Sequence, residues 1–262
     1  MSFPYKHVLM IGATAGIGKA MANRLIQEGV KVTAVGRREG RLDEFVTSHG
    51  AKKASAEQFD IADSNEIPTF AVNVTKRYPD IDCVFLNAGT QAAINLSDPA
   101  KWDLNAFQRD VSVNFVSFVN LTHAFLPFLL SKGSTTGLIY TTSHLAYIPA
   151  AGLSGYSASK AALNSFILCL RDQLRNSSVK VVELSPPVVQ TELHDYMGAR
   201  GREMGMPVAD FTDAAFAGLA SGNDEIFIGD LSVVSAERLG RIVNERRSAF
   251  NDLSKMLRGG KD

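Results

Sequence analysis

The sequence has little cysteine and no cluster of metal-binding side chains. Only two of its 262 residues are cysteines, Cys83 and Cys169, and neither belongs to a C-x-x-C or His/Cys group with the spacing of zinc ligands. We therefore predict no metal site. Cys83 lies in an apolar run and Cys169 in a helical pattern, which favours buried, reduced thiols over a disulfide and indicates a reducing compartment.

The sequence also lacks an excess of either charge and a long apolar stretch near its start. Lys plus Arg number 27 and Asp plus Glu number 27, so no basic surplus is available to neutralise a nucleic-acid backbone. The first apolar stretch, residues 8–11, is too short for a signal sequence or a membrane span. We expect a cytoplasmic protein that binds neither nucleic acid nor membranes.

Short β-branched runs alternate with longer helical patterns, which is typical of β-α-β units and a parallel sheet. Strands are predicted at residues 8–11, 30–35, a run ending at 59–61, 81–86, 138–142, 179–184 and 225–228. Helices are predicted around residues 20–26, 38–48, 65–76, 104–130 and 156–174. The fold class is therefore α/β, a doubly wound sheet of about seven parallel strands with helices on both faces.

No linker divides the chain, so residues 1–262 are predicted to form a single domain, with residues 230–262 as its C-terminal helical extension. In that extension Leu239, Val243 and Phe250 have the spacing of an amphipathic helix. Its apolar face could pack on its own domain, contact another subunit or lie on a membrane surface. Residues 194–206 show little periodicity and are predicted to form a loop or lid.

A glycine turn, residues 12–18, separates the first strand from the first helix. Gly12, Gly16 and Gly18 would let the backbone approach a pyrophosphate, which is then stabilised by the N–H groups and the positive dipole end of the helix. The alternative is an ordinary tight turn. Because a strand precedes the glycines and a helix follows them, the pattern favours nucleotide binding.

The second strand ends without the acidic residue that usually accepts a hydrogen bond from the ribose 2′-hydroxyl of NAD. The chain carries Arg37 and Arg38 there instead. A guanidinium can pair with a 2′-phosphate, which predicts NADP(H) as the cofactor. The alternative is that both arginines only flank a solvated helix start, where basic groups are disfavoured.

Tyr156 and Lys160 are four residues apart, which puts a phenol and an ammonium on one face of a helix. Ser143 ends the fifth predicted strand, at the sheet edge where ligands bind in open α/β folds. In this arrangement the lysine charge should lower the pKa of the phenol, and the serine hydroxyl could hydrogen-bond a carbonyl oxygen that is being reduced.

Together these motifs resemble the short-chain dehydrogenase/reductase superfamily over residues 12–191, and the resemblance implies a Rossmann-type fold. It also implies a catalytic tetrad of Asn114, Ser143, Tyr156 and Lys160. The cofactor-binding residues it implies are Gly12, Thr14, Gly16, Ile17, Gly18, Arg37, Arg38, Asp60, Ile61, Asn87, Ala88, Gly89, Tyr156, Lys160, Pro186, Val189 and Thr191.

Some positions depart from the common pattern of the superfamily. Ile11 and Leu86 stand where Thr and Asn are usual, and Pro187 replaces a common glycine. The sequence instead resembles the DltE-like branch, in which the shared segments are Pro186-Pro187, Thr191-Glu192-Leu193-His194, Tyr78-Pro79, Leu96-Ser97-Asp98-Pro99 and Leu145-Ala146.

The resemblance implies an NADP(H)-dependent oxidoreductase that transfers hydride between nicotinamide and a ketone, an aldehyde or a secondary alcohol, with Tyr156 as acid and base. Alternatives are a non-catalytic NADP(H)-binding scaffold or redox sensor, and a dehydratase or epimerase on the same fold. The resemblance further implies a homodimer or homotetramer packed through helices around residues 107–128 and 161–174.

His144 and His194 are expected either to line the substrate cleft or to lie outside it, without a catalytic role. Tyr147, Met197 and Met204 are expected either to form an apolar substrate wall or to serve ordinary packing.

Overall fold

The computed structural model describes residues 2–232 and 234–259. Within them seven parallel strands form one sheet in the order β3-β2-β1-β4-β5-β6-β7, which confirms the predicted fold class. The strands are β1 (His7–Ile11), β2 (Lys31–Gly36), β3 (Ala54–Gln58), β4 (Cys83–Leu86), β5 (Thr136–Thr141), β6 (Val179–Ser185) and β7 (Glu225–Phe227). The strand order reverses between β1 and β4, and a doubly wound sheet binds ligands at that crevice.

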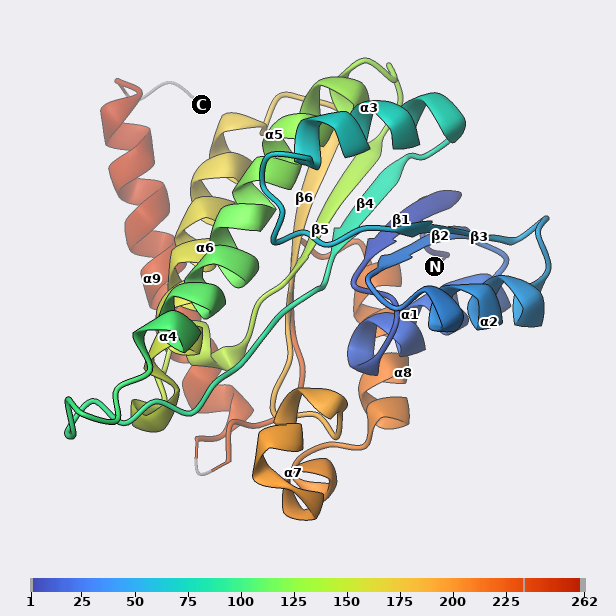
Figure 1. Cartoon of the computed structure of the whole chain (residues 1–262). Helices are drawn as coiled ribbons and strands as arrows, with labels where there is room; N and C mark the ends of the chain where they lie inside the picture. Colours follow the sequence, from blue (N-terminus) through green and yellow to red (C-terminus); the bar gives the residue numbers. More distant parts are fainter. Residues whose placement is uncertain (1, 233, 260–262) are drawn as a thin grey trace.

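Helices cover both faces of the sheet (Figure 1). One face carries α3 (Ile67–Arg77), α4 (Leu104–Val111), α5 (Ser117–Leu130) and α6 (Ser154–Gln173), and the other carries α1 (Gly16–Gln27), α2 (Glu39–His49) and α8 (Val208–Ala220). The sheet has a hydrophobic core on each face, and alternate residues of β1 belong to one or the other. Val8 and Met10 pack under α1, whereas Leu9 and Ile11 pack with α3 and α5. Burial on both faces explains why the strands are continuous apolar runs.

The predicted helix over residues 104–130 is interrupted by a π-helical turn, η1 (Ser112–Val116), between α4 and α5. The Ser117 hydroxyl donates to the carbonyl oxygens of Ser112, at 3.1 Å, and Ile61, at 2.6 Å. The extra residue in this turn is a local departure that sequence periodicity does not reveal, and such turns are frequent at functional sites.

The same segment, Leu104–Leu130, is the one stretch among the described residues long and apolar enough to cross a membrane, with a mean hydropathy of 1.5. Its apolar side chains instead pack in the protein core: Phe118, Leu121, Phe125 and Leu129 are fully buried. A helix that covers the sheet satisfies the same length and composition criteria.

Two element predictions were wrong in detail. The third strand ends at Gln58 rather than at residues 59–61, because the Asp60 side chain accepts a hydrogen bond from the Ala62 N–H and turns the chain. The predicted loop at 194–206 contains two short helices, η4 (Glu192–Met197) and α7 (Ala199–Glu203). They are joined at Gly198, whose φ of 68° favours glycine.

The prediction of two buried thiols is half right. Cys83 lies fully buried in β4, whereas Cys169 is exposed on α6, and neither forms a disulfide. Cys169 directly follows the buried Leu168, but its own side chain lies on the exposed surface of the helix. An apolar pattern alone did not resolve which face it occupies.

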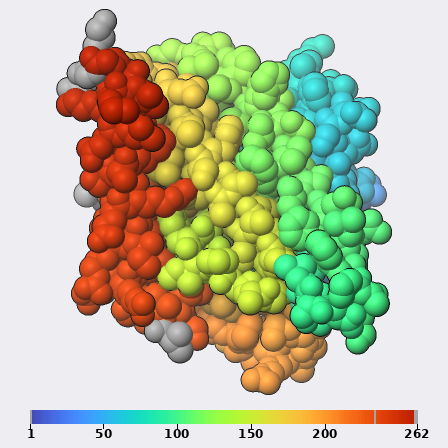
Figure 2. Space-filling view, turned by 90° about the vertical axis from the view of Figure 1, so that its left-hand side faces the viewer, coloured from blue at the N-terminus to red at the C-terminus, as the bar shows by residue number. Residues whose placement is uncertain are grey.

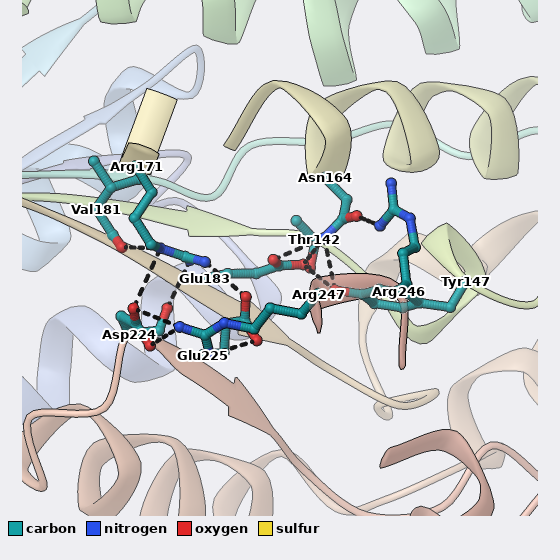
Figure 3. Close-up of polar contacts among 10 residues, drawn as sticks. All are labelled: Thr142, Tyr147, Asn164, Arg171, Val181, Glu183, Asp224, Glu225, Arg246 and Arg247. Carbon is teal, nitrogen blue, oxygen red and sulfur yellow. Dashed lines mark hydrogen bonds and ion pairs between the residues drawn. The ribbon is translucent and has the colours of Figure 1, made fainter. Parts of the chain in front are cut away.

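The C-terminal helix, α9 (Ala236–Leu257), packs on the rest of the chain beside α6, as Figure 2 shows on the face where α5, α6 and α9 lie side by side. Only Leu239 and Val243 of this helix are buried. The helix also makes polar contacts: Arg247 pairs with Asp224 and Glu225, each at 3.1 Å, and Arg246 donates to Asn164 (Figure 3). Residues 233 and 260–262 of the predicted extension lie outside the described residues.

Because α9 buries so few side chains, we expect its docking to depend strongly on Leu239. The substitution Leu239→Ala should lower the free energy of unfolding by about 2 to 4 kcal/mol, through lost transfer energy and a cavity. The control Ile242→Ala, at a side chain that is 38% exposed, should cost less than about 1 kcal/mol. Urea unfolding measures both, and equal losses would contradict this packing.

Candidate active site

A cleft of about 530 Å³ opens at the carboxyl ends of the strands. It brings together nearly all of the predicted site residues. Those that line it are Gly12, Thr14, Gly16, Ile17, Arg37, Arg38, Asp60, Ile61, Asn87, Ala88, Gly89, Ser143, Tyr156, Lys160, Pro186, Val189 and Thr191. Gly18 and Asn114 are not part of its surface and lie behind it.

The glycine turn owes its glycines to close backbone contacts. Gly12 has a φ of +89°, and a Cβ there would lie 2.6 Å from the backbone of Ala88. A Cβ on Gly18 would lie 2.1 Å from the Gly12 carbonyl oxygen. Helix α1 begins at Gly16, so its free N–H groups face the cleft. This arrangement suits a pyrophosphate at the start of α1.

Asn87 connects the glycine turn to the strand that precedes Ser143. Its amide nitrogen donates to the Gly12 carbonyl at 3.4 Å, and its amide oxygen accepts from the Thr141 hydroxyl at 2.9 Å. The carbonyl of Thr141 in turn accepts a hydrogen bond from Lys160 Nζ at 2.8 Å. The nucleotide end and the catalytic end of the cleft are thus held in fixed relation.

Ser143, Tyr156 and Lys160 converge as predicted, and all three side chains are buried. The Ser143 side chain lies near the Tyr156 phenol, whose pKa it acts to lower, and Lys160 Nζ lies 5.6 Å from the centroid of the Tyr156 ring. The pKa of Tyr156 is not lowered, however. Burial raises it to about 12, although the neighbouring Ser143 hydroxyl acts in the opposite direction. Burial also lowers the pKa of Lys160 to about 8.

Asn114 lies in the π-helical turn η1, directed at the helix that carries Tyr156. Its amide nitrogen donates to the Thr90 carbonyl at 2.9 Å and to the Ser159 hydroxyl at 3.1 Å, and its oxygen accepts from the Thr90 N–H at 2.8 Å. Four residues earlier, the buried Asp110 accepts from the Thr90 hydroxyl and the Ala92 N–H. Asp110 was not among the predicted site residues, although its four-residue spacing from Asn114 indicates a shared helix face.

The segment after β6, residues 186–197, folds over the glycine turn, and we call it the roof segment. Thr191 caps the start of η4, and its side chain lies 3.2 Å from the position that a Cβ on Gly16 would occupy. Val189 forms a parallel bridge with Met206. The contact between Thr191 and Gly16 explains why the roof segment and the glycine turn line one cleft.

At the far end of the cleft, each predicted arginine contacts a carboxylate. Arg37 is 69% exposed and lies 3.5 Å from Asp60, and Arg38 donates to Glu192 of the roof segment at 2.8 Å. Arg41 also donates to Glu192, at 2.8 Å. The sequence analysis did not identify a role for Arg41 or Glu192, since the contact joins residues about 150 positions apart.

The two histidines differ. His194 lines the cleft, where its Nδ1 lies 3.1 Å from the side-chain oxygen of Gln91. His144 is fully buried and does not line the cleft, and burial lowers its pKa to about 4. Met197 and Met204 also lie outside the cleft lining. Within residues 2–232 and 234–259, no three His, Cys, Asp or Glu side chains are grouped to hold a metal.

Behind Ser143 a buried carboxylate organises a polar network that the sequence analysis missed (Figure 3). Glu183 of β6 accepts hydrogen bonds from Thr142 at 2.6 Å, Tyr147 at 3.0 Å and Asn164 at 2.8 Å. Tyr147 is therefore a member of this network and not a substrate wall. A charged residue inside the apolar run 179–184 was the signal that could have identified it.

The buried lysine predicts a pH-dependent stability. The pKa of Lys160 is about 8 in the folded chain, whereas an unfolded lysine titrates near 10.4. Between these values the unfolded state binds more protons, so the free energy of unfolding rises with pH. Relative to Lys160→Met, the unchanged protein should gain about 1 kcal/mol between about pH 6.5 and about pH 9. Urea unfolding at both pH values measures this, and the exposed Lys180→Met should show no such gain. A pH-independent difference would contradict the lowered pKa.

Comparison with known proteins places these features in a family. The family model for short chain dehydrogenases matches residues 6–200. The chain is 34% identical over 223 residues to the uncharacterized oxidoreductase DltE of Bacillus subtilis, which covers 84% of this chain and 86% of the relative. This relative agrees with the predicted branch.

Two solved structures share the fold. The closed form of a serine dehydrogenase complexed with NADP+ is 28% identical, with a TM-score of 0.73, over 80% of this chain and 88% of that one. A short-chain dehydrogenase/reductase from Burkholderia phymatum in complex with NAD is 21% identical, with a TM-score of 0.77, over 86% and 89%. The extent of the family match, together with the cleft and its converging side chains, shows that this chain is a member of the short-chain dehydrogenase family.

Proposed function

We propose that this chain is an NADP(H)-dependent oxidoreductase that interconverts a small carbonyl compound, a ketone or aldehyde, and the corresponding alcohol. Its family membership makes it a hydride-transfer oxidoreductase with a nicotinamide cofactor. The observation that carries the finer proposal is the convergence of the buried Ser143, Tyr156 and Lys160 side chains in one cleft, which the glycine turn also lines.

Each of the site side chains has a separate role in the proton transfer. Tyr156 gives its phenolic proton to the carbonyl oxygen during reduction, or accepts it during oxidation, and Ser143 holds that oxygen by a hydrogen bond. The nicotinamide, when bound, supplies or accepts the hydride. Lys160 is held by the Thr141 carbonyl and lies 5.6 Å from the centroid of the Tyr156 ring, where its charge stabilises a phenolate. Asn114 fixes the Thr90 backbone and the Ser159 hydroxyl and is a positioning residue.

The residues at the second strand support NADP(H). Arg37 and Arg38 line the cleft where β2 ends, and both are partly exposed, so their guanidinium groups can reach a bound phosphate. The acidic group there, Asp60, comes from the segment after β3 and already faces Arg37. The bound NADP+ of the similar serine dehydrogenase is consistent with this choice.

We also propose a cytoplasmic homodimer or homotetramer. The helices around residues 107–128 and 161–174 lie next to α9 on the face of the molecule that Figure 2 shows. Val116 and Leu130, in and just after the first of these segments, are exposed apolar side chains. Residues of this kind are buried when two copies pack together. The mass from light scattering tests the proposal: a monomer mass at micromolar concentration would contradict it.

Removing the phenolic hydroxyl should abolish turnover and leave cofactor binding intact. Tyr156→Phe is expected to lower kcat by at least about a hundredfold, since it deletes the proton donor, while the Kd for NADPH changes less than about twofold. Steady-state kinetics and fluorescence titration measure the two quantities. The control Tyr78→Phe removes a hydroxyl bound to Glu57, away from the cleft, and should retain activity. Near-normal turnover by Tyr156→Phe would remove Tyr156 from the mechanism.

Reversing the charge at residue 37 should reverse the cofactor preference. In Arg37→Asp a carboxylate would repel the 2′-phosphate but accept a hydrogen bond from a ribose hydroxyl, so the ratio of NADPH to NADH affinity should fall by at least about tenfold. Fluorescence titration with both cofactors measures it. Arg77→Asp, which changes an exposed arginine on α3, is the matched control. If the preference survived, the phosphate would be recognised by another group.

A further inference from the structure

A carboxylate of the roof segment occupies the guanidinium groups at the adenosine end of the cleft. Glu192 accepts hydrogen bonds from Arg38 at 2.8 Å and from Arg41 at 2.8 and 3.0 Å. The same two arginines hold the glycine turn, since Arg38 donates to the Thr14 hydroxyl at 3.0 Å and Arg41 to the Thr14 carbonyl at 2.9 Å. We call Arg38, Arg41 and Glu192 the latch.

The latch spans the cleft. Both arginines belong to the start of α2, on the β2 side, whereas Glu192 begins η4 in the roof segment after β6. Partial burial raises the pKa of Glu192, but hydrogen bonds from Arg38 and Arg41 outweigh that effect and lower it below its ordinary value. Glu192 is therefore charged at neutral pH. It lines the cleft together with Arg37, Arg38 and Thr14.

The ion pairs at the latch leave too little positive charge to balance a further phosphate. Three guanidinium groups, of Arg37, Arg38 and Arg41, face two carboxylates, of Asp60 and Glu192. Their net charge is one positive, whereas a phosphate monoester carries close to two negative charges at neutral pH. With Glu192 in place, these five side chains and a bound 2′-phosphate would together carry a net negative charge. Without Glu192, the charges of the remaining four side chains and the phosphate would cancel.

We propose that Glu192 determines cofactor selectivity by competing with the 2′-phosphate of NADP(H) for Arg38 and Arg41, so that NADP(H) releases the roof segment and NAD(H) does not. The inference rests on the proposed function insofar as the cleft binds a nicotinamide cofactor at this end. A 2′-hydroxyl is neutral and leaves the latch closed. The Glu192 carboxylate thus occupies the arginines that the 2′-phosphate would bind, so it weakens the binding of NADP(H) and not that of NAD(H).

The matched pair Glu192→Gln and Asp195→Asn tests the competition. Asp195 lies in the same short helix and loses the same charge, but its partner is Arg202, at 2.8 Å, and it does not line the cleft. Calorimetric titration would use adenosine 2′,5′-bisphosphate and 5′-AMP, which differ by the phosphate in question. Glu192 is 29% exposed, so its neutral variant should fold normally.

We expect Glu192→Gln to bind the bisphosphate about tenfold more tightly than the unchanged protein, since one repulsive charge next to the phosphate is gone. Its affinity for 5′-AMP should change less than about twofold, and Asp195→Asn should change neither. Equal weakening of both ligands would overturn the proposal, because the latch would then only hold the roof segment closed over any adenosine. An unchanged bisphosphate affinity would overturn it too.

Hydrogen exchange follows the roof segment directly. The bisphosphate should accelerate exchange of the amides of residues 191–197 in the unchanged protein, and 5′-AMP should not. In Glu192→Gln these amides should exchange at the faster rate before ligand is added. Protection by the bisphosphate would contradict release.

These measurements do not depend on enzymatic turnover, and they distinguish failure of the proposed function from failure of this inference alone. If the unchanged protein did not prefer the bisphosphate to 5′-AMP, the proposed NADP(H) specificity would fail and this inference with it. If it did prefer the bisphosphate but Glu192→Gln behaved as Asp195→Asn, only the competition would fail.

Discussion

At the centre of the sheet two backbones pass each other so closely that no side-chain carbon fits between them. Gly12 meets the backbone of Ala88, and Gly18 meets the carbonyl oxygen of Gly12, which Asn87 also contacts. This contact opens the crevice at the start of α1 and fixes its distance from Thr141, whose carbonyl holds Lys160. A change in spacing here would displace the phosphate end and the proton-transfer end of the cleft together.

Different physical effects determine the charge states of the side chains at the two ends of the cleft. At the catalytic end burial dominates: it raises the pKa of Tyr156 and lowers that of Lys160, since it disfavours the charged form of each group. At the adenosine end, exposed and half-buried ions are paired, Arg37 with Asp60 and both Arg38 and Arg41 with Glu192. Charge from a bound cofactor would therefore act strongly at Tyr156, where water is excluded, and more weakly near Arg37, where solvent screens it.

Much of this architecture could be predicted, because it depends on local pattern. Strand and helix order, the glycine turn and the Tyr156–Lys160 pair each follow from spacing within a few residues. The π-helical turn around Asn114 could not, since one extra residue leaves the apolar periodicity almost unchanged. Glu183 and Glu192 were missed for another reason: their partners come from distant segments, so only the folded chain brings them together. Burial likewise reversed the expected direction of the pKa of Tyr156.

The docking of α9 has a consequence for how copies of this chain can associate. An exposed edge strand offers unpaired N–H and C=O groups to a neighbouring molecule. Here the edge strand β7 has only three residues, and Arg247 of α9 pairs with its Glu225. The opposite edge, β3, is short and polar, and its Glu57 is held by Arg77. Both edge strands are thus protected from pairing with strands of another molecule. This leaves the helical faces as the surfaces through which the protein can self-associate without aggregating.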